Sequence, residues 1–381
     1  MHYCVIGAGY VGMTLADALY KESSDRITII DNDVEKVKAI NKRYEGTNTV
    51  AVTTIPKFKY DMFFIALPTD YNRELGKFND MTLMTYILRI LETFPDTDIV
   101  IKSTVDVTFF EHKLVIDNIS RIHYVPEFLR ENSAITDFLL PDRIVIGTVS
   151  NEFADKYIQI MNKSLPASLR SVKNFIVSHK EACFIKLASN AYLAMRVAFF
   201  NEISSMTHGL NTKAIIEGIC ADRRIGNVYN NPSFGFGGYC LPKDTECLAN
   251  MNNYCSDLLK AVLKSNEDRV DYTANSILGM TNCNDVIGIY RLQFKEDASN
   301  IRRSPVIGIV QKLCIAKRKV YVYEPLLDHN NIHSNLKLID SLDELLKIST
   351  IIVANRYSSE LSSVKDKVFT YDLFSKDLQC E

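Results

Sequence analysis

The first 31 residues carry the pattern that most constrains the fold. An apolar run, Tyr3–Ile6, leads into Gly7-Ala8-Gly9-Tyr10-Val11-Gly12, followed by apolar residues at helical spacing, a second apolar run at Ile27–Ile30, and Asp31. Strand, GxGxxG, helix, strand and an acid about 20 residues past the glycines form the fingerprint of a dinucleotide-binding βαβ unit. A GxGxxG alone is a weak signal, but its placement here predicts dinucleotide binding.

Each part of this pattern has its own physical role. Gly7 permits a tight turn, Gly9 lets the backbone approach a pyrophosphate, and Gly12 lets the helix pack closely on the strand. Asp31 would bind the adenosine ribose and repel a 2′-phosphate, which favours NAD over NADP. The alternative is a glycine-rich turn of another α/β protein. The cofactor residues predicted in this segment are Gly7, Gly9, Tyr10, Val11, Gly12 and Asp31.

Strand and helix patterns alternate through the rest of the first half, which predicts a mainly parallel, doubly wound sheet. The further strands expected are Met62–Leu67, Ile99–Lys102, Ile122–Val125 and Ile144–Thr148, with helices at Leu83–Thr93, Phe109–Ile116 and Asn151–Asn162. Ligands of such sheets bind beyond the carboxyl ends of the strands. Three polar clusters fall there: Pro68-Thr69, Lys102-Ser103-Thr104, and Glu127 with Glu131. Each alone could be a solvated loop, but three at one edge favour a site.

A long helix is predicted from Glu181 to His208, a stretch without proline or glycine. Lys186 and Asn190 stand four residues apart, so they share one face of this largely apolar helix. A buried lysine is costly without an anionic partner, which favours a functional role. The alternative is a lysine that reaches solvent from the helix edge.

The stretch from Asn230 to Asp244, NNPSFGFGGYCLPKD, is the least ordinary in the chain. Its glycines allow close approach of backbone amides to a ligand, and its aromatics can pack on the ligand's apolar faces. A helix is expected from Lys243 onward. Cys240 would then stand just before a helix amino end with Lys243 nearby, and both lower the pKa of a thiol. A buried structural cysteine is an equal alternative on spacing alone.

A third α/β unit begins near Asp285 and lacks a GxGxxG. It is predicted to follow a connecting helix, Asp257–Met280, and to contain strands Val286–Tyr290, Val320–Tyr323, Thr350–Val353 and Val368–Tyr371 with a helix at Pro305–Ile315. Positive charge at Arg291, Lys295, Arg302, Arg303 and Arg356 suits a diphosphate ligand. We therefore expect a dinucleotide-binding domain at 1–178, a central helical segment at 179–280 and a second Rossmann-like domain at 281–381.

Composition excludes several other classes of protein. The chain has 381 residues and a net charge of −2, so bulk electrostatics indicate neither a nucleic-acid nor a membrane-surface partner. Its nine cysteines form no CxxC pair and its seven histidines no HExxH, so no metal site or disulfide scaffold is expected. The start of the sequence does not resemble a signal peptide, and we expect a cytoplasmic protein.

Six segments together resemble the UDP-glucose/GDP-mannose dehydrogenase family over essentially the whole chain. They are GAGYVG, IKST, PEFLRE, KLASNAYLAMRVAFFNE, NNPSFGFGGYCLPKD and YRLQFK, in this order. The cysteine loop looks more like the UDP-glucose members than the GDP-mannose members. The resemblance implies two Rossmann-like domains joined by a long central helix, with the substrate between them, and usually a homodimer. It also implies oxidation of UDP-glucose to UDP-glucuronate with reduction of two NAD⁺.

The resemblance also implies catalytic roles, residue by residue. Cys240 would be the nucleophile that forms a thiohemiacetal and then a thioester, and Lys186, supported by Asn190, would stabilise the oxyanion. Thr104 and Asp244 would hold or activate water or the reacting hydroxyl. Glu127 and Glu131 are further acid/base candidates, and the base of the first oxidation stays open among these residues.

The same resemblance implies binding residues. Thr69, Thr104, Lys243 and Lys295 match cofactor positions. Arg224 matches an arginine that reaches the partner subunit's substrate. The expected substrate residues are Glu127, Phe128, Leu129, Arg130, Lys186, Asn190, Arg224, Tyr229, Asn231, Phe234, Gly235, Gly237, Arg291 and Arg356.

One departure from the family pattern and three rival functions remain. The region from Asn41 to Asp61 is short, as if a β-α unit were pared down, which leaves the local sheet order open. The rivals are a dehydrogenase of another sugar nucleotide, a two-electron hydroxyacid dehydrogenase, and a catalytically silent NAD-binding regulator. Cys240 argues against the second, and the full set of polar residues argues against the third.

Overall fold

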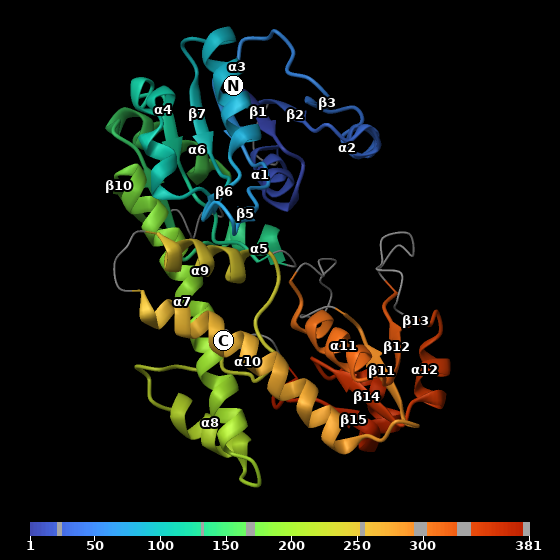
Figure 1. Cartoon of the computed structure of the whole chain (residues 1–381). Helices are drawn as coiled ribbons and strands as arrows, with labels where there is room; N and C mark the ends of the chain where they lie inside the picture. Colours follow the sequence, from blue (N-terminus) through green and yellow to red (C-terminus); the bar gives the residue numbers. More distant parts are fainter. Residues whose placement is uncertain are drawn as a thin grey trace. The chain divides into compact units, whose positions relative to one another are not determined.

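The computed structural model describes residues 1–20, 25–130, 133–164, 172–251, 256–292, 303–325 and 337–375. It divides into two compact units, Met1–Leu187 and Ala188–Glu381. The long helix α7 (His179–Met206) begins in the first unit and ends in the second. Each unit contains a mainly parallel sheet with helices beside it (Figure 1). The predicted fold, two Rossmann-like doubly wound domains joined by a long central helix, is confirmed.

The first unit is built on a sheet in the order β10-β9-β8-β7-β4-β1-β2-β3. Every neighbouring pair is parallel except β8 and β9, which are antiparallel. A small antiparallel hairpin, β5 with β6, is separate from this sheet. The bounds are β1 His2–Ile6, β2 Arg26–Ile30, β3 Thr49–Val52, β4 Met62–Ile65, β5 Tyr71–Asn72, β6 Lys77–Phe78, β7 Asp98–Ile101, β8 Ile122–Tyr124, β9 Arg143–Gly147 and β10 Lys173–Val177.

The strands β1 and β4 are buried along nearly their whole length, because helices cover both faces of this sheet. On one face, alternate residues of β1, β2 and β4 share a core with side chains of α1, α2, α5 and α6. On the other, the Phe94 ring after α3 packs on Phe63. The bounds are α1 Tyr10–Tyr20, α2 Val34–Arg43, α3 Met81–Thr93, α4 Lys113–Asp117, α5 Ala134–Leu139 and α6 Asn151–Ser164.

The prediction of one helix at Phe109–Ile116 is wrong. A 3₁₀ turn, Val107–Glu111, is followed by extended backbone at His112 and only then by α4. The Asp106 carboxylate accepts the backbone N–H groups of Thr108 and Phe109 and so starts the turn early. Because Phe109 and Phe110 are both buried, the tight turn serves to place two consecutive rings in the core.

The short segment before β4 lacks a crossover helix, in line with the pared-down unit seen in the sequence. Residues 53–61 run from β3 to β4 as loop, yet the order β1, β2, β3 is kept. A cavity of about 390 Å³ lies over the starts of β1 and β2 and beside β3, lined by Thr28, Val50, Phe58 and neighbouring residues. It is at the opposite strand ends from the glycine turn.

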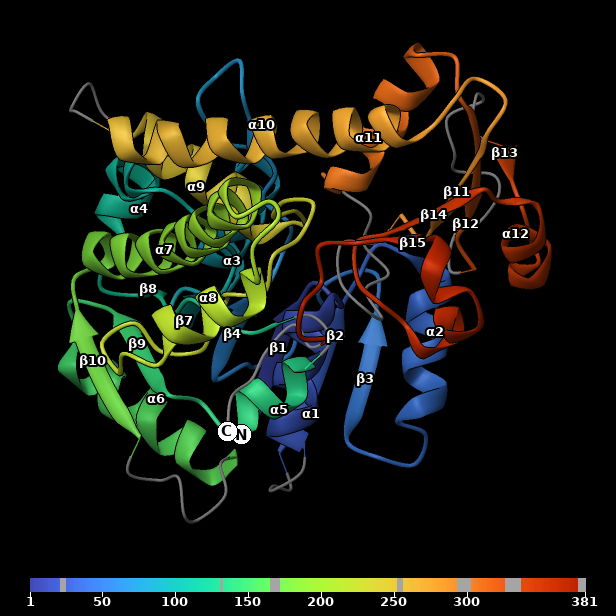
Figure 2. The ribbon, with the colours of Figure 1, turned by 90° about the horizontal axis from the view of Figure 1, so that it is seen from below.

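The second unit contains the parallel sheet β13-β12-β11-β14-β15. The long helix α10 packs against both α9 and α11, and Figure 2 shows α10 along its length. The bounds are α8 Thr212–Cys220, α9 Cys240–Asn250, α10 Asp257–Met280, β11 Val286–Tyr290, α11 Pro305–Ile315, β12 Lys319–Tyr323, β13 Lys337–Leu338, α12 Leu342–Ile348, β14 Ile351–Ala354 and β15 Val368–Phe369.

Helix α7 is long and apolar enough, by length and composition, to cross a membrane. Half of its most apolar stretch is buried within the protein, as in the core helix of a globular fold. Its length is therefore weak support for a membrane span.

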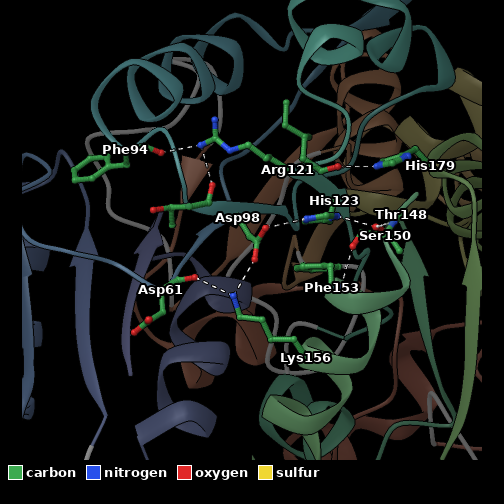
Figure 3. A network of polar contacts seen from close by, with 12 residues as sticks. Asp61, Phe94, Asp98, Arg121, His123, Thr148, Ser150, Phe153, Lys156 and His179 are labelled. Atoms are coloured by element: carbon green, nitrogen blue, oxygen red, sulfur yellow. Dashed lines mark hydrogen bonds and ion pairs between the residues drawn. The ribbon is translucent and has the colours of Figure 1, made fainter.

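A polar network, buried at His123 and partly exposed at Lys156, crosses β7, β8 and α6 (Figure 3). The fully buried His123 ring stacks on Phe153, with ring centroids 3.3 Å apart, and its Nδ1 lies 2.8 Å from Thr148 Oγ1. Lys156 Nζ donates to Asp98 Oδ2 at 2.9 Å. Burial lowers the pKa of His123, and the nearby Asp98 carboxylate offsets this only in part. Burial also lowers the pKa of His179.

These histidines predict a loss of stability in mild acid. Their pKa values in the folded protein lie below the ordinary value of about 6.5. As pH falls through that value, the unfolded chain binds protons that the folded chain excludes, so the free energy of unfolding decreases. We expect urea midpoints to fall between pH 7 and pH 5. The decrease should be shallower in His123→Gln than in the wild type. The exposed His208→Gln serves as the control, and an unchanged slope in His123→Gln would contradict this account.

Candidate active site

In the glycine turn after β1, a side chain would find space at one glycine and would clash at the other two. Gly7 has φ +99°, and a Cβ there would lie 2.4 Å from Ala66 O. A Cβ on Gly12 would lie 1.9 Å from Gly7 O. A Cβ on the exposed Gly9 would meet no atom within 4 Å. Gly7 and Gly12 are thus needed by the fold, whereas the surface of Gly9 is free for a ligand.

Asp31 stands beside this turn, at the end of β2. Its Oδ2 accepts the backbone N–H of Ala8 at 2.9 Å, and its Oδ1 accepts that of Asp33 at 3.0 Å. Tyr10 and Val11 open α1 and are half-buried. An open glycine, a helix amino end and a carboxylate together fit the pyrophosphate and ribose of a dinucleotide.

The polar clusters at the carboxyl edge of the first sheet are joined by hydrogen bonds. Thr69 Oγ1 donates to Thr104 O at 2.5 Å, which ties the loop after β4 to the loop after β7. Lys102 Nζ donates to Glu127 Oε1 at 2.5 Å and to Tyr157 OH at 2.7 Å. Burial alone would lower the pKa of Lys102, but the Glu127 carboxylate and Tyr157 outweigh it and raise that pKa.

The segment after Glu127 uses its side chains in different ways. The Phe128 ring lies between Lys186 Nζ, 5.3 Å from its centroid, and the Arg143 guanidinium at 4.2 Å. Leu129 packs against the core of the first unit. The Arg130 guanidinium pairs with Asp137 at 2.6 Å. Glu131 lies outside the described residues.

Lys186 and Asn190 lie one turn apart on α7, as the sequence predicts. Lys186 is 6% exposed, and its Nζ donates to the backbone oxygen of Glu127 at 2.5 Å. Asn190 Nδ2 donates to Asp244 Oδ2 at 2.5 Å. The ammonium group of Lys186 is therefore held by a carbonyl in the first unit, and Asn190 orients a carboxylate in the second.

Cys240 is the first residue of α9, and Tyr239 is the helix cap. The expected helix start at Lys243 is wrong, because Pro242 sits in the first turn, where its missing N–H costs no hydrogen bond. Asp244 Oδ1 accepts Lys243 Nζ at 2.9 Å, so both carboxylate oxygens of Asp244 are bound. Asp244 is fully buried and Lys243 is 2% exposed, whereas Cys240 is half-buried.

The loop before Cys240 is held mostly by side chains of its own unit. Asn231 Nδ2 donates to Asp372 Oδ1 at 2.8 Å, and Arg356 Nη1 donates to Pro232 O at 2.7 Å. Phe234 is fully buried in the core of the second sheet, so its side chain cannot line an open site. Tyr229 and Gly235 both have positive φ angles, of 52° and 138°. Gly237 is buried.

The remaining predicted residues lie elsewhere in the second unit or outside the description. Arg224 pairs with Asp222 at 2.6 Å and its side chain is 85% exposed. Arg291 has a positive φ of 64°, and its Nη2 lies 3.4 Å from Glu360 Oε2. Arg303 Nη1 pairs with Glu246 Oε2 at 2.7 Å. Lys295 and Arg302 lie outside the described residues.

Several residues of this arrangement were missed as site residues. In the sequence, Lys102 stands only as part of a polar cluster, and Tyr157 carries no mark of a site. A lysine that directly follows a fully apolar strand is a signal that could have marked Lys102. No local pattern marks Tyr157 or Asp372, because each meets its partner only through the fold.

The geometry defines a class of protein: a dinucleotide-binding oxidoreductase with a cysteine at a helix amino end. Residues 43–164, 180–268 and 288–375 match the NAD binding, central and UDP binding domains of the UDP-glucose/GDP-mannose dehydrogenase family. Residues 3–55 match a TrkA-N domain. The chain belongs to the UDP-glucose/GDP-mannose dehydrogenase family, whose members are NAD-dependent dehydrogenases.

Known relatives span the whole chain. A UDP-glucose 6-dehydrogenase of Streptococcus pneumoniae is 37% identical over 99% of this chain and 100% of its own length. One of Campylobacter jejuni is 35% identical with the same coverage.

Solved structures show the same fold. The UDP-glucose dehydrogenase of Pyrobaculum islandicum superposes with a TM-score of 0.86 at 22% identity, covering 99% of this chain and 95% of that one. The UDP-D-ManNAc dehydrogenase of Pyrococcus horikoshii has a TM-score of 0.81 at 19% identity, with coverage of 97% and 94%.

The glycine turn yields a paired prediction. Gly9→Ala should leave stability within about 0.5 kcal/mol of the wild type, because the new methyl group meets nothing. It should weaken NAD⁺ binding about tenfold or more, since the methyl occupies the pyrophosphate surface. Gly12→Ala should instead lower stability by roughly 1–3 kcal/mol through overpacking. Calorimetric NAD⁺ titration and urea unfolding measure both effects, and wild-type NAD⁺ affinity in Gly9→Ala would exclude this surface.

Proposed function

We propose that this protein oxidises C6 of UDP-glucose to the carboxylate of UDP-glucuronate, reducing two NAD⁺ per sugar. The observation that carries the proposal is the setting of Cys240: a thiol on the first turn of α9, beside an Asp244 held by Asn190 and Lys243. The UDP binding domain match at 288–375 and the two full-length relatives named UDP-glucose 6-dehydrogenase support the substrate.

Binding roles follow from the family match and the local geometry. Residues 1–178 would bind NAD, with Gly9 and Asp31 at the pyrophosphate and ribose and Thr69 and Thr104 as further contacts. Lys243 and Lys295, from the later segments, would add contacts to the cofactor. Residues 281–381 would bind the UDP moiety, and 179–280 would carry catalysis and dimer contacts. The proposed substrate residues are Glu127, Phe128, Leu129, Arg130, Lys186, Asn190, Arg224, Tyr229, Asn231, Gly235, Gly237, Arg291 and Arg356, with Phe234 contributing its backbone only.

Bound NAD⁺ supplies the hydride acceptor for each of the two oxidations. After the first, the sulfur of Cys240 adds to the C6 aldehyde and forms a thiohemiacetal. The positive end of the α9 helix dipole favours negative charge at this place. Loss of hydride then gives a thioester, and water cleaves it to the carboxylate and restores the thiol.

Lys186 would stabilise the oxyanion in these steps, because its ammonium group is fixed and removed from bulk water. Asn190 would assist it by hydrogen bonding. Asp244 and Thr104 would hold water or the reacting hydroxyl, and Glu127 or Glu131 would transfer protons. The exposed Arg224 suits a role at a partner subunit, so we propose a homodimer. We also propose that the protein is cytoplasmic.

A related substrate is the second candidate. The Pyrococcus horikoshii structure of the same fold is described as a UDP-D-ManNAc dehydrogenase. The same thiol chemistry would serve an N-acetylhexosamine, and only the groups around the 2-substituent would differ.

The function is tested by stoichiometry. Limiting UDP-glucose with excess NAD⁺ should give two NADH per sugar at completion, followed by absorbance, and Cys240→Ser should form no UDP-glucuronate. The exposed Cys314→Ser is the matched control and should behave as wild type. One NADH per sugar in the wild type would refute the four-electron reaction. Activity only on a UDP-N-acetylhexosamine would transfer the mechanism to the second candidate.

The role of Lys186 is tested by kinetics. Lys186→Ala should lower kcat by about 10²–10³-fold while KM for the sugar nucleotide changes little, because oxyanion stabilisation acts in the transition state. Lys180→Ala, which removes an exposed lysine of the same helix, is the control. A raised KM with wild-type kcat would assign Lys186 to substrate binding instead.

A further inference from the structure

The loop that leads to Cys240 is buried although it has no regular secondary structure. Residues from Asn230 to Gly238 are all buried and contain neither helix nor strand. Buried backbone N–H and C=O groups need hydrogen-bond partners, and among the described residues no strand pairs with this loop. Side chains from other elements of the same unit must therefore satisfy this backbone.

Helix α10 supplies two of these side chains from one face, one turn apart. Asn266 Oδ1 accepts the N–H of Phe236 at 2.7 Å, and Asn266 Nδ2 donates to Phe236 O at 2.9 Å. Arg269 Nε donates to Ser233 O at 2.9 Å. The amide of Asn266 thus pairs with one residue as a neighbouring strand would, and it leaves no room at Gly235. A Cβ on Gly235 would lie 2.8 Å from Asn266 Oδ1.

Arg269 also connects the loop to α7. Its Nη1 donates to Asn201 O at 3.0 Å and to Ser205 Oγ at 2.5 Å. Asn201 Oδ1 accepts the N–H of Ser233 at 2.8 Å. Ser233 is therefore held from both sides, through its N–H by α7 and through its C=O by α10.

The charge of Arg269 is buried in an unusual way. The residue is 4% exposed, and its guanidinium stacks on the Tyr371 ring, 3.9 Å from the centroid. Burial lowers its pKa to about 10, and the two tyrosines beside it offset this only in part. The hydrogen-bond partners given above are carbonyl and hydroxyl oxygens. A planar fork can reach Ser233, Asn201 and Ser205 at once, which a single ammonium group of lysine cannot do.

We propose that Asn266 and Arg269 are positioning residues that place the Cys240 thiol, an inference that rests on the proposed role of Cys240. They act through the backbone of Ser233 and Phe236, and only Gly237, Gly238 and Tyr239 separate Phe236 from the thiol. Gly238, with φ +82°, makes the turn into α9. Release of either anchor lets the first turn of α9 shift, and a misplacement of about 1 Å costs a reaction up to about 100-fold.

The experiment compares Asn266→Leu and Arg269→Lys with the wild type by two readouts. We expect kcat for UDP-glucuronate formation to fall about tenfold to 100-fold. Without substrate or cofactor, the rate at which iodoacetamide alkylates Cys240, followed by peptide mass spectrometry, should change severalfold. Alkylation of Cys314 in the same sample should not change.

Matched variants separate positioning from loss of stability. Ile352→Val lowers stability from the sheet of the same unit, in a core cluster that contains no residue of the loop, and it should keep the wild-type kcat and Cys240 alkylation rate. Asn266→Asp keeps the acceptor for the Phe236 N–H, so its kcat and its Cys240 alkylation rate should lie between those of the wild type and Asn266→Leu. It takes the place of Asn266→Leu in the test if the leucine variant does not fold. If Asn266→Leu, Asn266→Asp and Arg269→Lys lose stability but keep both wild-type values, the proposal is overturned. If wild type reduces no NAD⁺, the proposed function fails, while the alkylation rates still decide the positioning.

Discussion

Parallel pairing places the carboxyl ends of neighbouring strands at one edge of a sheet, and the ligand-facing part of the first unit depends on this constraint. The glycine turn, the Thr69 loop, the Thr104 loop and Glu127 follow four different strands, far apart in sequence. They meet because β1, β4, β7 and β8 run in the same direction in adjacent positions. The hydrogen bonds from Thr69 to Thr104 and from Lys102 to Glu127 are the direct result.

Buried charge is the second constraint, and the chain meets it in three ways. Lys102 is paired with a carboxylate and a phenol, which keep it charged although it is buried. Asp244 is bound at both oxygens, by an amide and an ammonium group. Arg269 is surrounded by carbonyl oxygens and aromatic faces. Lys102 and Asp244 lie among or beside the proposed catalytic residues, whereas Arg269 holds the backbone that leads to Cys240. Buried ions that are fully hydrogen-bonded favour one arrangement, because any shift leaves a charge unpaired.

The second unit shows how a loop can be as well defined as a strand. Four side chains, Asn201, Asn266, Arg269 and Asn355, bind the backbone of Ser233, Phe234 and Phe236. They come from α7, from α10 and from the end of β14. The same loop anchors Phe234 in the core of the C-terminal sheet, so the site and the hydrophobic core share one segment.

The sequence by itself determined the fold class and the cofactor turn, and it marked Cys240 as the candidate nucleophile. Those features are local: a glycine pattern, an apolar period or one short motif contains all the residues involved. Local patterns failed in detail at the break at His112, where the Asp106 carboxylate starts a 3₁₀ turn early, and at the start of α9, where Pro242 stands in the first helical turn. The tertiary structure alone decided which groups meet, because Tyr157, Arg269 and Asp372 reach their partners across 55, 36 and 141 residues. Hydrogen bonding and burial depend on distance in space, and separation along the chain does not reveal that distance.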